Sequence, residues 1–197
     1  MKGTEEKKAD GEMRASEREA AMRDRIEARL AELPVMQYAF IEIRDLEFED
    51  RVRYICETEC SQYGRSWACP PAVGTVEECK KRCFQYREGF VFTTLSEVPD
   101  IQDIEQTLAT RGSHEEITRK ICGFFKDEGE DVMALSTESC AICKTCTYPN
   151  GPCRHPEKMF PCVESYGILV TALAEKYGIE FMNGGNVVTW FSLILLR

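Results

Sequence analysis

The stretch Val187-Val-Thr-Trp-Phe-Ser-Leu-Ile-Leu-Leu196 is the longest apolar run in the chain, and it predicts a buried strand. Thr189 and Ser192 interrupt the run, which is well short of the ~18 apolar residues that a membrane-spanning helix needs. We therefore expect no membrane partner. A buried strand requires neighbouring strands and covering helices, and the residues before it contain candidates for both.

Strand and helix patterns roughly alternate along the rest of the chain. Further strands are expected over residues 35–48, 89–95 and 131–136. Helices are expected over residues 76–87, 101–108, 115–125 and 163–177. Thr75-Val-Glu-Glu78 is a capping box for the first of these helices, Gly178 ends the last one, and residues 54–69 are expected to form a loop. The pattern predicts an α/β or α+β class: a single domain with a mixed sheet, flanking helices and two cysteine-rich metal-binding loops.

The N-terminal segment differs in composition from the rest. Residues 1–33 hold 17 charged residues, eight basic and nine acidic, and Met22, Ile26 and Leu30 recur at every fourth position. This predicts a charged tail that runs into an amphipathic helix ending before Pro34. The helix is either a solvated appendage or a docking helix. We therefore divide the chain into this segment, 1–33, and a cysteine-rich metal-binding domain, 34–197.

The overall composition excludes several classes of protein. The chain has 197 residues, 43% of them hydrophobic, and a formal net charge of −9. That charge argues against a nucleic-acid partner bound by phosphate neutralisation. The N-terminus has no apolar segment of the secretory type, yet the chain holds eleven cysteines. Without export, metal binding is favoured over a disulfide framework, and we expect a cytoplasmic protein from a reducing, oxygen-poor cell.

The densest cysteine group is Cys140-Ala-Ile-Cys143-Lys-Thr-Cys146-Thr-Tyr-Pro-Asn-Gly-Pro-Cys153, with the spacing C-x2-C-x2-C-x6-C. It is close to the bacterial ferredoxin run C-x2-C-x2-C-x3-C-P, whose thiolates hold [4Fe–4S] clusters. The last interval is longer here, and the proline comes at Pro156. We predict that all four cysteines of this second group are metal ligands.

A first group precedes it, with Cys56 and Cys60 followed by Cys69 and Pro70-Pro71. Three thiols at this spacing predict a first metal site that needs a fourth ligand. Cys79 is preferred because it is near the Pro70-Pro71 loop. Three alternatives stay open: Cys83 on the same helix face, Cys162, and a ligand from outside the protein. Cys79 and Cys83 could instead be small core residues.

The remaining cysteine and both histidines are expected to have structural roles rather than to bind metal, and Cys162 stays an open candidate. Cys122 is expected in the core, and His114 is expected to be solvated at a helix start. Cys162 follows Pro161 and is expected to open a helix, whose N-terminus would favour the thiolate. His155 is the one possible nitrogen ligand beside the second group and would allow a Cys3His zinc site, although a role in hydrogen bonding to a cluster is preferred.

The combination Tyr63-Gly-x3-Ala-Cys69-Pro-Pro with Cys140-x2-Cys-x2-Cys-x6-Cys-Arg-His-Pro resembles the family of metal-binding proteins called domain of unknown function 2284. The resemblance covers residues 50–197. It implies a cysteine-ligated metal, of the iron–sulfur type, in anaerobic bacteria and archaea. The matching positions are Cys56, Cys60, Cys69, Cys140, Cys143, Cys146 and Cys153.

These observations predict an iron–sulfur protein with one or two [4Fe–4S] clusters. It would act in electron transfer, or as an accessory to an anaerobic redox enzyme, with a redox protein as its partner. The alternative from another class is a structural zinc module that serves interactions. A third interpretation is a metal-free dithiol formed by Cys140 and Cys143.

Overall fold

Two compact units make up the chain, Met1–Pro34 and Val35–Arg197. The computed structural model describes residues 2–197, and the side chains of residues 13 and 16–197. Most of the first unit is helix α1 (Lys2–Leu30), which ends before Pro34 as expected. Among the helices of residues 2–197, none combines the length and apolar character that crossing a bilayer requires.

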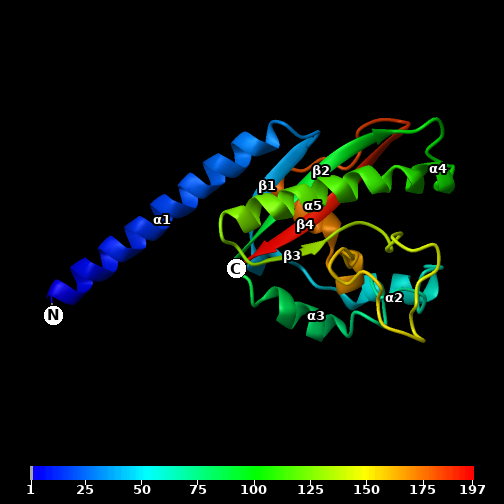
Figure 1. Ribbon diagram of the computed structural model, residues 1–197, viewed down its shortest axis with the longest axis horizontal. Helices are drawn as coiled ribbons and strands as arrows, with labels where there is room; N and C mark the ends of the chain where they lie inside the picture. Colours follow the sequence, from blue (N-terminus) through cyan, green and yellow to red (C-terminus); the bar gives the residue numbers. More distant parts are fainter. Residues whose placement is uncertain (1) are drawn as a thin grey trace. The chain divides into compact units, whose positions relative to one another are not determined.

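The second unit is built on a four-stranded sheet with the strand order β1-β2-β4-β3 (Figure 1). The strands are β1 (Gln37–Glu42), β2 (Glu88–Glu97), β3 (Val132–Leu135) and β4 (Val187–Leu196). The α+β class is confirmed, but all three ladders are antiparallel rather than mixed. Strands β2 and β3 run in the same direction, as their helical connection suggests, but β4 lies between them and opposes both.

One face of the sheet is covered by helix α5 (Arg111–Asp127), as Figure 1 shows. The ring of Phe90 on β2 meets the ring of Phe125 on α5 edge-to-face at 5.3 Å. At the other end of the helix, the indole N–H of Trp190 on β4 donates to the Thr110 hydroxyl at 2.9 Å. These contacts hold α5 along the sheet and fix the position of its first turn.

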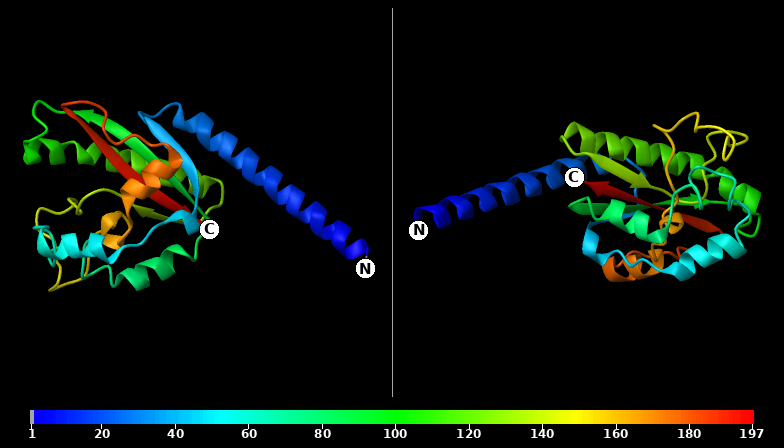
Figure 2. Two further views of the ribbon diagram at one scale, coloured as in Figure 1. Left: turned by 180° about the vertical axis from the view of Figure 1, so that it is seen from behind. Right: turned by 90° about the horizontal axis from the view of Figure 1, so that it is seen from below.

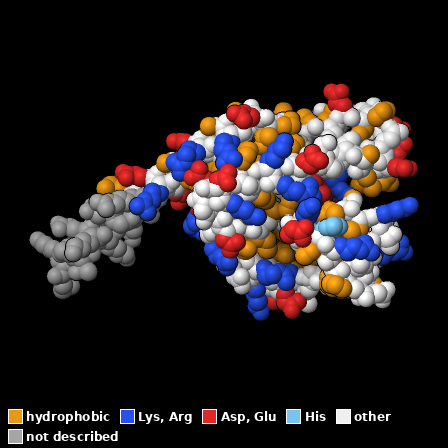
Figure 3. Space-filling view, viewed as in Figure 1, with side chains coloured by type: hydrophobic (Ala, Val, Ile, Leu, Met, Phe, Trp, Pro, Cys, Tyr) orange, Lys and Arg blue, Asp and Glu red, His pale blue; other side chains and the backbone are white. Residues whose placement is uncertain are grey.

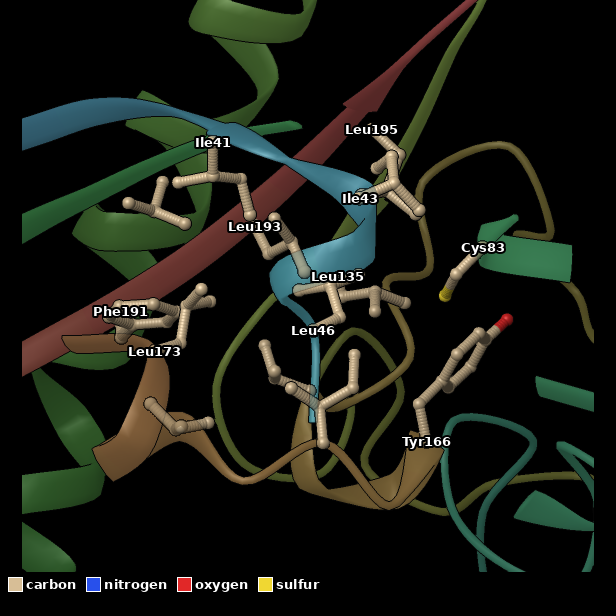
Figure 4. Packing of buried hydrophobic residues seen from close by; sticks show 14 of the residues in the cluster. Ile41, Ile43, Leu46, Cys83, Leu135, Tyr166, Leu173, Phe191, Leu193 and Leu195 are labelled. Carbon is tan, nitrogen blue, oxygen red and sulfur yellow. The ribbon is translucent and has the colours of Figure 1, made fainter. Parts of the chain in front are cut away.

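The opposite face of the sheet carries the main hydrophobic core (Figure 4). Phe191, Leu193 and Leu195 of β4 lie in this core with residues of helix α6 (Val170–Tyr177) and of the short 3-10 helix η2 (Glu164–Tyr166). Strand β4 is therefore buried on both faces. This explains why its sequence is a nearly continuous apolar run instead of an alternating one.

Helix α2 (Asp50–Thr58) extends into the segment that was expected to be a loop, so that prediction is wrong at its start. Arg53 on this helix is buried. Its guanidinium donates to the backbone carbonyls of Gly74 and Ser165, which holds the helix in place. These bonds tie α2 to two distant segments. The remaining elements are η1 (Ile43–Asp45), α3 (Val76–Cys83) and α4 (Ile104–Ala109).

The helix expected over residues 163–177 is divided by Gly167, between η2 and α6. Gly167 has a φ of 79°, which places it in the left-handed region, and a Cβ there would lie 2.9 Å from Cγ1 of Val76. Only glycine allows both the backbone conformation and the close approach of α3. In contrast, the capping box that starts α3 is confirmed, with both side-chain bonds present between Thr75 and Glu78.

His114 is buried against the sheet, so the prediction that it is solvated is wrong. Its Nδ1 lies 2.8 Å from the Thr94 hydroxyl and its Nε2 lies 2.8 Å from the Ser192 hydroxyl. Both ring nitrogens are thus satisfied by neutral partners. Burial lowers the pKa of His114 from 6.5 to about 4, although a hydrogen bond with the Phe191 backbone opposes the shift.

This depressed pKa predicts a loss of stability in mild acid. The unfolded chain protonates the imidazole below about pH 6.5, whereas the folded protein resists protonation until about pH 4. Between pH 7 and pH 5, His114 should therefore cost about 2 kcal/mol of unfolding free energy. Urea denaturation at the two pH values checks this. His114→Gln should lose about 2 kcal/mol less than the wild type over the same interval, and an equal loss would contradict the assignment.

Candidate metal centre

The second cysteine group lies on a loop whose two ends are joined at Ser136, directly after β3. The Ser136 N–H donates to the carbonyl of Pro161 at 2.9 Å, and the Ser136 carbonyl accepts from the N–H of Val163 at 2.9 Å. The hydroxyls of Ser136 and Ser192 also bond at 3.1 Å. These bonds close the loop over residues 137–160 and hold both of its ends against the sheet.

All four cysteines of this loop line one cavity of about 660 Å³: Cys140, Cys143, Cys146 and Cys153. The structure thus brings the whole second group to one space. The other walls come from the loop of the first cysteine group, through residues such as Arg65 and Trp67, and from the junction of α4 and α5. Three segments that are distant in sequence therefore enclose the thiols.

Trp67 clamps the two cysteine loops together. Its indole N–H donates to the carbonyl of Gly151 at 3.1 Å, and its ring meets the ring of Tyr148 edge-to-face at 4.9 Å. The two loops accordingly lie beside each other at one end of the domain, as Figure 1 and Figure 2 show. Because Trp67 joins the two loops, residues of both cysteine loops line the cavity.

The cavity is basic in a protein that is acidic overall. Its lining includes Arg65, Arg111, Lys144 and Arg154 but a single carboxylate, Glu105, whereas the net charge of the chain is −9. Figure 3 shows Lys and Arg side chains gathered around the histidine visible on one face. A centre bound by four thiolates carries net negative charge, and these cations would offset it.

In the second group, the environment of the Cys140 thiol favours its protonated form. Burial raises the pKa of the Cys140 thiol, and the charges of Glu115, Cys153 and Cys143 raise it further. The effect of Cys153 and Cys143 on Cys140 shows that these three thiols are electrostatic neighbours. Metal binding would have to displace protons here, and its affinity should fall in acid.

The first group is also brought together. Cys56 lies near the end of α2, Cys60 lies two residues after its last residue, and the loop then returns to Cys69. Burial raises the pKa of Cys69 to about 12, with the charge of Cys60 as the next cause and that of Cys56 as a smaller one. Burial followed by the charge of Cys60 likewise raises the pKa of Cys56. The three thiols therefore share one neighbourhood.

Cys79, the preferred fourth ligand, has other neighbours. It is fully buried, its Sγ accepts from Arg82 at 3.0 Å and from Arg53 at 3.8 Å, and its S–H points to the carbonyl of Val73 at 3.5 Å. Burial raises its pKa, and the charges that act on it most strongly are those of Arg82 and Arg53. The structure thus gives the Cys79 sulfur polar partners on two helices and on the loop before α3.

Cys83 and Cys122 lie in the hydrophobic interior, as the core interpretation expects. Cys83 belongs to the main core and faces the ring of Tyr166 (Figure 4). Burial raises the pKa of each thiol to about 12. Both therefore behave as small apolar side chains.

Sequence comparison gives the chain a family. Residues 39–196 match the family described as Predicted metal-binding protein (DUF2284). The chain belongs to this family. The resemblance drawn from the two cysteine motifs is confirmed, and the matched residues lie within the second unit. No curated protein and no solved structure matches the chain.

For this DUF2284 protein, the donor set suits a metal that thiolates bind, because four thiols share one cavity. Among the side chains of residues 13 and 16–197, no three from Cys, His, Asp or Glu already converge on a point that could hold a single ion. His155 lines the cavity with the four cysteines and remains available to a bound group.

Sequence reasoning missed one feature of the site and was wrong about another. The basic lining includes Arg111, which is buried and pairs with Glu115 at 3.9 Å; only the folding of α5 onto the loop reveals it. Cys162 does not open an α-helix, and burial, followed by the charge of Glu164, raises its pKa well above the usual value instead of lowering it. Because Cys162 is far from Cys69 in sequence, spacing along the chain does not indicate that the two residues lie near each other in the fold.

The two core cysteines should resist alkylation. The thiolate is the reactive form, and a pKa of about 12 for Cys83 and Cys122 leaves roughly a thousandfold less thiolate at pH 8 than an ordinary thiol has. Iodoacetamide treatment of the native protein, followed by mass spectrometry, should leave both unmodified. Both should react once guanidinium unfolds the chain. Rapid labelling in the native protein would contradict their placement.

Proposed function

We propose that this protein holds one or two thiolate-ligated iron–sulfur clusters of the [4Fe–4S] type and transfers electrons to or from a protein partner. The observation that supports this best is the cavity itself, because Cys140, Cys143, Cys146 and Cys153 all line it. The first group, with Cys56, Cys60 and Cys69, would supply the second cluster.

A cluster accounts for the donor set better than a single ion does. Zinc needs four ligands within about 2.3 Å of one point, and structural zinc sites draw them from two separated pairs of ligands. The first three thiols of the second group instead follow one another in consecutive C-x2-C steps, and all four line one cavity. A cluster can accept thiolates that approach from different sides, since each binds a different iron.

The chain's own residues would position and tune such a group. Trp67 and Tyr148 fix the loop, and the guanidinium of Arg154 donates to the carbonyl of Thr145 at 2.9 Å, which holds this cation on the cavity wall. When bound, the cluster supplies one-electron redox chemistry, with a potential set by charge, hydrogen bonds and exposure. Positive charge around it favours the reduced, more negative state.

An external partner could reach this site. Ala141, Lys144 and Thr145 are exposed, and they line the cavity together with the four thiols. A cluster held there would be close to the surface, as electron exchange between proteins requires. We therefore propose a redox protein as the partner, either a carrier or an anaerobic enzyme.

The test is metal and sulfide analysis of protein purified without oxygen, together with its visible absorption spectrum. About four or about eight irons per chain with matching sulfide, and a brown colour that bleaches on reduction, support the proposal. One or two zincs and no colour would overturn it in favour of the zinc-binding interaction module. Metal-free protein with a reversible Cys140–Cys143 disulfide would overturn it in favour of the dithiol.

Replacing Cys143 with serine should remove the second centre. Iron should fall by about four per chain, because the cluster of this centre is lost. The melting temperature should fall by roughly 10 °C, since the lost ligation should cost about 3 kcal/mol of unfolding free energy and each kcal/mol lowers the melting temperature by about 2–4 °C. Iron analysis and circular dichroism melting check both effects.

Cys122→Ser is the matched control, since it makes the same chemical change inside α5. It should lower the melting temperature modestly and keep the full metal content. If Cys143→Ser retained all its iron, the assignment of the second group would be wrong.

A further inference from the structure

Cys162 lies beside the first cysteine group although 92 residues separate it from Cys69. Its backbone N–H donates to the carbonyl of Ala68 at 3.3 Å, so the residue is held next to the one that precedes Cys69. It also forms an isolated parallel bridge with Ser136, at the closed end of the second loop. Backbone bonds on two sides thus fix where this cysteine stands.

Packing of η2 on α2 brings the rest of the first group to the same place. Arg53 of α2 donates to the carbonyl of Ser165 in η2, and the two helices pack against each other. Cys56 lies one turn after Arg53 on α2, while Cys162 lies two residues before the start of η2. Electrostatics agree with this placement, since the charge of Cys69 acts on Cys162 and that of Glu164 acts on Cys56.

We propose that Cys162 supplies the fourth thiolate of the first metal centre, beside Cys56, Cys60 and Cys69. The assignment rests on the proposal that the first group binds metal. It replaces Cys79, whose sulfur is already engaged with Arg82, Arg53 and the Val73 carbonyl. Moving Cys79 to the first group would leave a buried guanidinium of Arg53 with one partner fewer.

The Cys162 side chain is oriented by Glu164, because its S–H donates to the Glu164 carboxylate. The Glu164 carboxylate also lies close enough to Cys56 for its charge to raise the pKa of that thiol. We assign it the role of a positioning residue rather than a ligand, since the thiols already number four.

A fourth thiolate changes what the first centre does. With three protein ligands, one iron of a cubane would be open to a substrate, and the protein could be an enzyme. With four, each iron has a protein ligand, as in clusters that transfer electrons. Both centres would then be of the electron-transfer kind.

The test compares the iron content of the full chain and of single variants, all purified without oxygen. The wild type should hold about eight irons, and Cys162→Ser and Cys143→Ser should each hold about four, lost from different centres. Cys79→Ser is the matched control and should keep about eight. Glu164→Gln should also keep about eight, with a shifted reduction potential for one centre.

Double variants guard against simple misfolding. Cys69→Ser with Cys162→Ser should lose no more iron than either change alone, whereas Cys143→Ser with Cys162→Ser should lose all of it. Circular dichroism of Cys162→Ser should retain the wild-type helix content.

Four outcomes overturn the assignment. Full iron in Cys162→Ser, or loss of half the iron in Cys79→Ser, would mean that Cys162 is not the ligand. A wild type with about four irons, all lost in Cys143→Ser, would remove the first centre but leave the proposed function standing. A wild type without iron overturns the proposed function, and this assignment with it.

Discussion

Burial of β4 on both of its faces is the constraint on which the second unit depends. The strand pairs with β2 from Val187 to Leu196 and with β3 from Leu193 to Leu196. The last apolar pair of the β3 ladder is Leu135 with Leu193, and the next position pairs the hydroxyls of Ser136 and Ser192. The ladder changes from apolar to polar at this step, which is where β3 ends and the second cysteine loop begins.

Ser192 extends that polar step into the layer beneath α5. Its hydroxyl contacts Nε2 of His114 at 2.8 Å and the Thr118 hydroxyl at 3.0 Å. A buried hydroxyl is costly unless it is bonded, and this one has partners in Ser136, directly after β3, and in α5. The network therefore fixes α5 against the start of the loop, and with it the cationic wall that Arg111 contributes to the cavity.

The sequence predicts the parts of this protein that depend on local pattern. The bounds of β4 follow from its apolar run, the start of α3 follows from the capping box at Thr75, and the second cysteine group follows from its spacing. What could not be predicted depends on contacts between distant segments. Gly167 divides a helix because Val76 approaches it, and His114 is buried because β4 offers it a hydroxyl.

The cysteines show the same division most clearly. Sequence ranks possible ligands by closeness along the chain, which favours Cys79 over Cys162 as a companion of Cys69. The fold ranks them by what surrounds each thiol: Cys79 faces two guanidinium groups, whereas Cys162 is bonded to the backbone beside Cys69. The Cys79 sulfur has polar partners without a metal, whereas neighbouring thiols raise one another's pKa and can lose their protons together only when a metal binds the thiolates. Spacing along the chain identifies the groups with enough cysteines to bind a metal. The surroundings of each thiol in the fold then indicate which cysteines are ligands.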